Sequence, residues 1–146
     1  MNNKQTVIGW REWVSLPELH IERIKAKIDT GARTSALHAF DLKPTHTNGA
    51  NRIQFKIHPI QEDESTVLAC TANIHDERWI TDSGGHRERR FVIKTPILLG
   101  DMTWPIEITL TNRDTMGFRM LLGRTAMDRR LIVDPSQSFL MRPEEG

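Results

Sequence analysis

The residues best suited to chemistry in this chain lie in the segment Asp29-Thr30-Gly31-Ala32. Directly before it, residues 23–28 alternate basic and apolar side chains, a period of two that is typical of a half-buried strand. Such a strand would deliver the Asp29 carboxylate to a tight turn, where it could act as a general base toward water. The same residues are also typical of an ordinary turn, in which aspartate caps the backbone and glycine supplies a positive φ.

A second segment, Leu121-Leu122-Gly123-Arg124, offers an apolar pair, a glycine and the start of a short helix over about residues 124–130. A carboxylate at a strand end, supported by such a segment, is typical of one half of an aspartic protease site. That chemistry needs two carboxylates that share one proton. We therefore expect the second Asp29 to come from a two-fold related copy. Asp82-Ser83-Gly84 is an alternative source within the chain, although its setting favours a turn at the tip of a hairpin.

Composition limits the setting of this chemistry. The chain has 146 residues, which predicts one domain over residues 1–146 with an ordered core at about 6–141. Its single cysteine, Cys70, excludes a disulfide within the chain and favours a reducing compartment, so we expect a cytoplasmic protein. No apolar run is long enough to span a membrane, and a net charge of +1 gives no support for binding nucleic acid.

Strand patterns dominate the rest of the chain. Alternating apolar residues predict strands over 53–57 and 104–110, and the second of these forms a hairpin with residues 91–99 through a Gly100-Asp101 turn. Further strands are expected over 67–74 and 131–133, and a terminal one over 139–141. Many short strands with one short helix predict an all-β barrel or sandwich.

These segments together resemble the retropepsins, the aspartic proteases of the retroviral type. Asp29-Thr30-Gly31-Ala32 is similar to their active-site loop, and residues 121–127 are similar to their second signature, two aliphatic residues followed by Gly-Arg and a short helix. Gly84 and Gly85, before the strand at Phe91, resemble their flap. More narrowly, residues 8–134 resemble a bacterial retropepsin-like aspartic endopeptidase family that is often labelled ATP-dependent zinc protease. The resemblance implies an acid-protease closed barrel that works as a homodimer on a peptide or protein substrate.

The resemblance also implies roles for individual residues. The catalytic residues would be Asp29, Thr30 and Gly31: Thr30 would tie the two loops together across the symmetry axis, and the Gly31 N–H would donate to the carboxylate. Substrate binding would fall to a second group, which comprises Ala32, Arg33, Gly84, Gly85, Leu121 and Leu122.

The zinc and ATP parts of the family label have no counterpart in the residues. The six histidines are scattered, none forms a His-x-x-x-His pair with a glutamate, and one cysteine cannot form a Cys-x-x-Cys pair. No phosphate-binding loop of the type Gly-x-x-x-x-Gly-Lys-Ser/Thr is present. We therefore expect no metal site and no cofactor.

Arginine takes the place of an aspartate that retroviral enzymes carry two residues after the glycine. Arg33 would face Arg124, and both need an acid, either internal (Asp41, Asp128 or Asp134) or supplied by the substrate. Residues 87–90 (Arg-Glu-Arg-Arg) present the same choice between a solvated charge run and a carboxylate-binding surface.

The sequence thus predicts a retropepsin-type aspartic endopeptidase. Because the resemblance links the family to glutamate-ligase systems, acidic or glutamate-rich peptides are the expected substrates. A catalytically silent peptide-binding module on the same fold and a metal-dependent peptidase are the alternatives.

Overall fold

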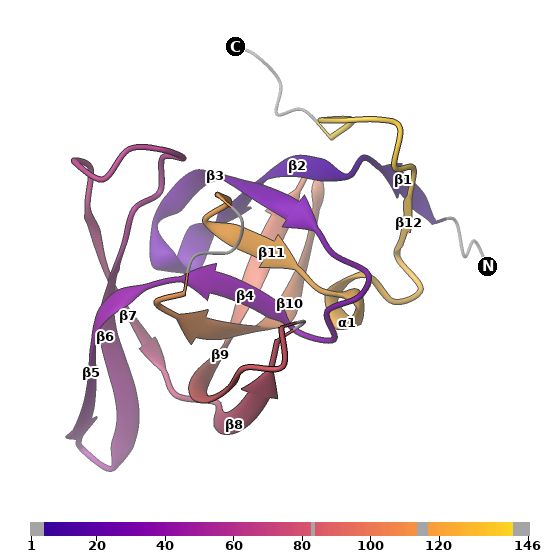
Figure 1. The fold of residues 1–146 in the computed structure, drawn as a ribbon. Coiled ribbons are helices and arrows are strands. Elements are labelled where there is room, and N and C mark those ends of the chain that lie inside the picture. Colours follow the sequence, from indigo (N-terminus) through magenta and orange to yellow (C-terminus); the bar gives the residue numbers. More distant parts are fainter. Residues whose placement is uncertain (1–4, 83, 114–116, 142–146) are drawn as a thin grey trace.

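The computed structural model describes residues 5–82, 84–113 and 117–141, and nearly all of its regular structure is β-strand (Figure 1). The all-β prediction is therefore confirmed. The strands are β1 (Thr6–Ile8), β2 (Arg11–Leu16), β3 (Ile21–Ile28), β4 (Ser35–His38), β5 (Phe40–Thr47), β6 (Ala50–Ile57), β7 (Leu68–Asn73), β8 (Asp76–Thr81), β9 (Arg87–Leu99), β10 (Met102–Thr111), β11 (Met120–Leu122) and β12 (Leu131–Val133). The helical segments are the 3-10 turn η1 (Pro17–Leu19) and the helix α1 (Arg124–Met127).

A closed barrel forms the body of the molecule. Among the described residues, seven strands make one sheet in the order β10-β4-β11-β3-β2-β9-β8, and a further pairing of β9 with β10 closes the ring. β11 lies between β3 and β4, parallel to the first and antiparallel to the second. The predicted barrel is thus confirmed, and the pairing of β11 with β3 places Leu122 beside Ile28 at the end of β3.

The apolar side chains of the alternating strands fill the interior of the barrel, as the sequence predicts. β9 and β10 form the expected hairpin around Gly100, with Leu99 opposite Met102. One continuous hydrophobic core takes a side chain from almost every barrel strand. Its largest fully buried members are Ile8, Leu16, Ile21, Ile24, Leu37, Ile53, Phe55, Ile57, Ile93, Ile97, Leu99 and Ile108. Burial of each such side chain stabilises the fold by about 1.5–3 kcal/mol relative to an exposed one.

A second, three-stranded sheet (β5-β6-β7) extends from the barrel, and Figure 1 shows its β5–β6 hairpin reaching away at the lower left. β1 and β12 form a separate parallel pair near the two ends of the chain. None of the helices in the described part of the chain is long and apolar enough to cross a membrane.

Two sequence predictions need correction. The helix ends at Met127 rather than near Arg130, because Asp128 leaves helical geometry (ψ 125°) and Arg129 has a positive φ of 65°. Residues 139–141 do not form a strand. Instead, the amides of Leu140 and Met141 donate to the buried carboxylate of Glu12, both at 2.9 Å. This carboxylate accepts the hydrogen bonds that the carbonyls of a partner strand would otherwise accept.

Candidate active site

The loop that carries Asp29 begins where β3 ends. Its backbone is held by β11, because the Asp29 N–H donates to the Leu122 carbonyl at 2.9 Å. The Ala32 N–H closes the turn onto the Asp29 carbonyl at 3.2 Å, and the Gly31 N–H donates to Asp29 Oδ1 at 3.0 Å. The carboxylate is half-buried, and one of its oxygens is thus oriented by the backbone. The strand end predicted for Asp29 is confirmed.

A glycine lets the second segment pass close to this loop. The Gly123 N–H donates to Ser35 Oγ at 3.0 Å, and Ser35 is fully buried. The next two amides, of Arg124 and Thr125, donate to the carbonyls of Ala32 and Arg33 at 2.8 and 3.0 Å. The start of α1 therefore clamps the backbone that follows Asp29. Ser35 is a supporting residue to which the sequence analysis gave no role, although a serine directly before the apolar Ala36 and Leu37 at the start of β4 was a usable signal.

The two leucines of this segment differ in what they can contact. Leu122 is fully buried, so its side chain supports the loop from the core. Leu121 is half-buried and lies opposite Lys27 of β3. The substrate-binding roles predicted for Leu121 and Leu122 both stay predictions.

The predicted flap is the hairpin of β8 and β9. Gly84 and Gly85 lie in its turn, where Asp82 Oδ1 accepts from the amides of Gly84 and His86 at 3.0 and 2.9 Å. The hydrogen bond from His86, which outweighs the opposite effect of burial, holds the pKa of Asp82 below its ordinary value. Asp82 is thus occupied in a turn, the role that the sequence favoured over an acid at the Asp29 site.

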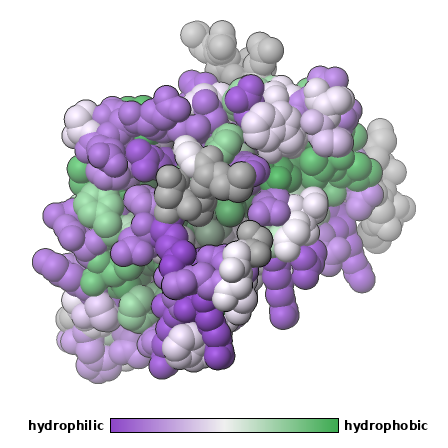
Figure 2. Space-filling model, in the orientation of Figure 1, coloured by the Kyte–Doolittle hydropathy of each residue, from purple (hydrophilic) through white to green (hydrophobic). Residues whose placement is uncertain are grey.

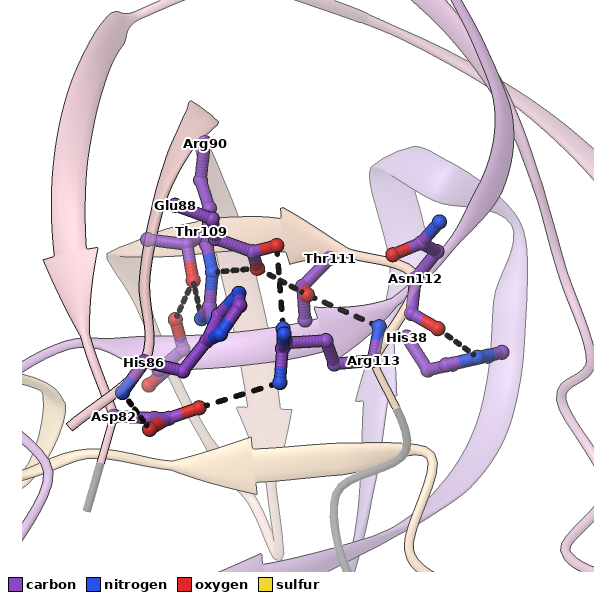
Figure 3. A network of polar contacts seen from close by, with 10 residues as sticks. His38, Asp82, His86, Glu88, Arg90, Thr109, Thr111, Asn112 and Arg113 are labelled. Atoms are coloured by element: carbon purple, nitrogen blue, oxygen red, sulfur yellow. Dashed lines mark hydrogen bonds and ion pairs between the residues drawn. The ribbon is translucent and has the colours of Figure 1, made fainter. Parts of the chain in front are cut away.

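A polar network joins this hairpin to the end of β10 (Figure 3). Glu88 accepts from Thr111 Oγ1 at 2.6 Å and from Arg90 Nε at 2.5 Å, and Arg113 lies 3.5 Å from its second oxygen. Arg113 also lies 3.6 Å from Asp82. Partial burial acts to raise the pKa of Glu88, but these hydrogen bonds and the charges of Arg90 and Arg113 outweigh it, so the pKa is lowered.

The predicted arginine cluster divides into paired and unpaired members. Arg89 pairs with Glu77 at 2.9 Å, and Arg90 is bound by Glu88. Arg87 lies over the exposed ring of Trp79, 4.7 Å from its centroid.

Near the catalytic loop, Arg33 is exposed and forms no ion pair with any described side chain. Arg124 points to the carbonyls of Thr30 and Gly31 at 3.4 and 3.5 Å. Of the acids considered for internal pairing, Asp41 binds Lys56, and Asp134 accepts from Ser136. Arg33 thus keeps its charge available next to the catalytic loop.

A hollow opens on the other side of this loop. It is lined by Thr30, by Gln5, by Arg124 and Met127 of α1, and by Leu131 and Val133 at β12.

Within residues 5–82, 84–113 and 117–141, no group of three or more His, Cys, Asp or Glu side chains is placed to hold a metal ion. The donor set in this part of the chain therefore does not fit the zinc of the family label.

Comparison with known proteins gives a consistent picture. A family model described as "RimB-like: Retropepsin-like aspartic endopeptidase RimB" matches residues 7–144. The fold is similar to the crystal structure of Lpg0085, a protein of unknown function from Legionella pneumophila. The TM-score is 0.79 at 26% identity, and the match covers 95% of this chain and 100% of that one.

Curated relatives carry a different name. The chain is 45% identical over 141 residues to a "Probable alpha-L-glutamate ligase" of Shewanella pealeana, and 49% identical over 130 residues to one of Desulfotalea psychrophila. These matches cover 97% and 89% of the chain but 31% and 28% of the relatives. The chain therefore spans less than a third of the length of these relatives.

Proposed function

Because the chain belongs to the RimB-like family of retropepsin-like aspartic endopeptidases, we propose that it hydrolyses peptide bonds as a homodimer, with one Asp29 from each copy. The observation that carries this proposal is the Asp29 loop itself. Its carboxylate is half-buried, and the backbone around it is clamped by β11 and by the first turn of α1. Catalysis by positioned carboxylates requires this kind of rigid support.

Two such carboxylates placed about 3 Å apart cannot both be ionised, so they share one proton. The ionised member takes a proton from a bound water, and the protonated member donates a hydrogen bond to the scissile carbonyl. The Gly31 N–H, 3.0 Å from Asp29 Oδ1, orients the carboxylate for this task. Thr30 is exposed, so its hydroxyl is available to the partner's loop. In this mechanism the chain needs neither zinc nor ATP.

The surface beside the loop supports a dimer. Val7 of β1 and Ile132 of β12 are register partners, and each exposes nearly half of its surface (45% and 48%). Figure 2 shows hydrophobic side chains gathered over these strands, to the right of the view. The hollow next to Thr30 is lined by the neighbours of Ile132 on the same strand, Leu131 and Val133. A second copy that packs here would cover exposed apolar surface and bring the two Thr30 loops together.

Acidic peptides are the substrates that this site favours. Arg33 follows the catalytic turn, is exposed and has no described acid as a partner, and a guanidinium binds carboxylates strongly. The names of the relatives suggest a setting in which glutamate is joined to other molecules. The single buried cysteine suits a reducing compartment such as the cytoplasm.

The experiment compares wild type with Asp29→Asn on glutamate-rich and neutral peptides, with Asp101→Asn, an exposed aspartate in the β9–β10 turn, as the control. We expect Asp29→Asn to abolish cleavage, because an amide cannot accept the proton of water, and Asp101→Asn to cleave at the wild-type rate. A chelator should leave the rate unchanged, and sedimentation should show a dimer.

Two results would overturn the proposal. Loss of activity with the chelator, restored by zinc, would identify a metal-dependent peptidase. Peptide binding without cleavage, at a concentration where the chain is dimeric, would identify a silent binding module.

A further inference from the structure

The outer face of β2 and β3 carries four basic side chains. Arg11 and Lys27 are register partners, Lys25 pairs with Trp13, and Arg23 precedes the buried Ile24. We call Arg11, Arg23, Lys25 and Lys27 the basic strip. The intervening residues of β2 and β3 point into the barrel, and among them is the carboxylate of Glu12, which is fully buried.

Three members of the basic strip have no carboxylate partner in the part of the chain that the structure describes. Arg11, Arg23 and Lys25 form no ion pair with a described carboxylate. Glu22, the other acid of these two strands, is exposed and also forms none. Arg11, Arg23 and Lys25 therefore keep their positive charge on this outer face without a described carboxylate to neutralise it.

Aromatic rings hold three of these cations in place. The Arg23 guanidinium lies 3.9 Å from the Trp13 ring centroid, and Lys25 Nζ lies 5.1 Å from it. Arg11 lies 4.9 Å from the ring of Phe139 and 4.7 Å from that of Trp10. Such cation–π contacts stabilise a cation without neutralising it. The strip is consequently an ordered positive surface.

The position of Phe139 depends on the buried acid behind the strip. Phe139 stacks on Trp13 with centroids 5.6 Å apart, and its N–H donates to the Arg11 carbonyl at 3.0 Å. The two residues after it donate their amides to Glu12. The segment that ends the described chain is thus fastened to β2 in a way that completes the aromatic support.

The geometry of the strip distinguishes between two kinds of anionic ligand. Proteins that bind single-stranded nucleic acid combine cations with aromatic faces on which bases stack. Here the Trp13 ring already has Arg23 over it and is stacked with Phe139, so it offers little room for a base. Guanidinium and ammonium groups held in this way suit carboxylates instead.

The spacing also fits an extended peptide. Arg23, Lys25 and Lys27 are two residues apart, so they repeat about every 6.6 Å along β3. Side chains on one side of an extended peptide have the same repeat. The strip ends at Lys27, two residues before Asp29.

We propose that the basic strip binds the acidic stretch of a peptide, by its carboxylates, alongside the Asp29 loop. The role of the strip as part of a substrate-binding surface rests on the proposed function. The binding of an acidic peptide to the strip does not depend on it. It adds a second carboxylate-binding surface to Arg33, on a different element.

The test measures binding in the Asp29→Asn chain, which separates it from any question of catalysis. A labelled oligoglutamate peptide is titrated by fluorescence anisotropy at two salt concentrations. Arg23→Gln/Lys25→Gln is compared with Lys43→Gln/Lys94→Gln, which removes the same charge from exposed positions on β5 and β9. We expect about tenfold weaker binding for the first pair and less than about twofold for the control. Thermal melts verify that each variant is folded. If the first pair does not fold, Arg11→Gln replaces it, with an expected loss of severalfold.

Three outcomes would overturn the inference. Equal losses in both double variants would mean that only net charge matters. Equal affinities for oligoglutamate and oligoglutamine would exclude carboxylate recognition. Tighter binding of a single-stranded RNA of the same charge would identify a nucleic-acid surface. If instead the wild type proves unable to cleave peptides while the strip variants still lose oligoglutamate binding, the strip stands and the proposed function fails.

Discussion

Gly123 lies so close to the backbone of Thr34 that a Cβ added to Gly123 would stand 2.6 Å from the Thr34 carbonyl carbon. The amide of Ser35 and the Thr34 oxygen would each be 2.8 Å away. These are backbone atoms of the segment that follows the catalytic loop, and they cannot move aside without displacing it. The close approach of β11 to this loop therefore requires a glycine.

Gly123→Ala should destabilise the fold by about 1–3 kcal/mol and shift the Asp29 loop, because overpacking against backbone forces the loop away. Denaturant unfolding measures the first effect, and the peptide cleavage rate measures the second. For the stability measurement, the matched control is Gly84→Ala, whose added Cβ would meet Asp82 Oδ1 at 3.4 Å. A Gly123→Ala variant with wild-type stability would contradict this account of the loop.

Glu12→Gln should loosen the segment that crosses β2. The carboxylate of Glu12 accepts from three amides, those of Gly9, Leu140 and Met141, at 2.7, 2.9 and 2.9 Å. The NH2 group of a glutamine side chain would face at least one of these backbone N–H groups, and two donors cannot form a hydrogen bond. We therefore expect the free energy of unfolding to fall by about 2–4 kcal/mol. Hydrogen exchange at residues 137–141 should rise in Glu12→Gln and stay unchanged in the exposed control Glu22→Gln. Unaltered exchange in Glu12→Gln would argue against the anchoring role.

Acid should weaken the junction between β8 and β10. Two hydrogen bonds from Arg78 to Glu107, at 2.8 and 3.1 Å, lower the pKa of Glu107 from its ordinary value of 4.5, against the opposite effect of burial. A carboxylate with a lowered pKa in the folded state contributes stability above pH 4.5, and this contribution is lost as the pH falls through the folded value.

Glu107→Gln should consequently show a shallower fall in stability below pH 4.5 than wild type, together with lower stability at neutral pH. Urea unfolding at a series of pH values makes the comparison. The control is Glu64→Gln, an exposed position outside this ion-pair group. Parallel curves for Glu107→Gln and wild type would show that the pair contributes nothing to the pH dependence.

Cys70 should resist thiol reagents in the folded protein. It is 5% exposed, its Sγ lies 3.6 Å from the Leu19 carbonyl, and burial raises the pKa of the thiol to about 11. The reactive thiolate is therefore scarce at neutral pH. A chromogenic disulfide reagent should react slowly in buffer and rapidly in denaturant. Rapid labelling of the native chain would indicate that β7 opens readily from the core.

Local patterns in the sequence were sufficient for several parts of the fold. The basic–apolar alternation before Asp29 predicted β3 and the position of the carboxylate at its end. The alternation around Gly100 predicted the β9–β10 hairpin, and the alternation of Ile53, Phe55 and Ile57 predicted which side chains of β6 are buried. In each case one face of a strand meets the core, so apolar residues occur at every second position of the sequence.

The sequence analysis did not predict strands that lack this alternation of apolar and polar residues. β8 begins Asp76-Glu77-Arg78 and β5 contains Pro44, so neither has the composition of a strand. β8 exists because it pairs with β9 along its whole length, and its charges are matched by Arg89 and Glu107. Tertiary pairing here outweighs a weak local preference.

The sequence by itself determined the half-site: a carboxylate at a strand end, its glycines, and the apolar segment that supports it. Only the tertiary structure decided how these parts meet. Insertion of β11 between β3 and β4 joins segments about ninety residues apart, and parallel pairing over such a separation leaves no local pattern. The same holds for Ser35 beneath Gly123 and for Glu12 behind the basic strip, because a buried polar group is satisfied by whichever distant backbone the fold brings to it.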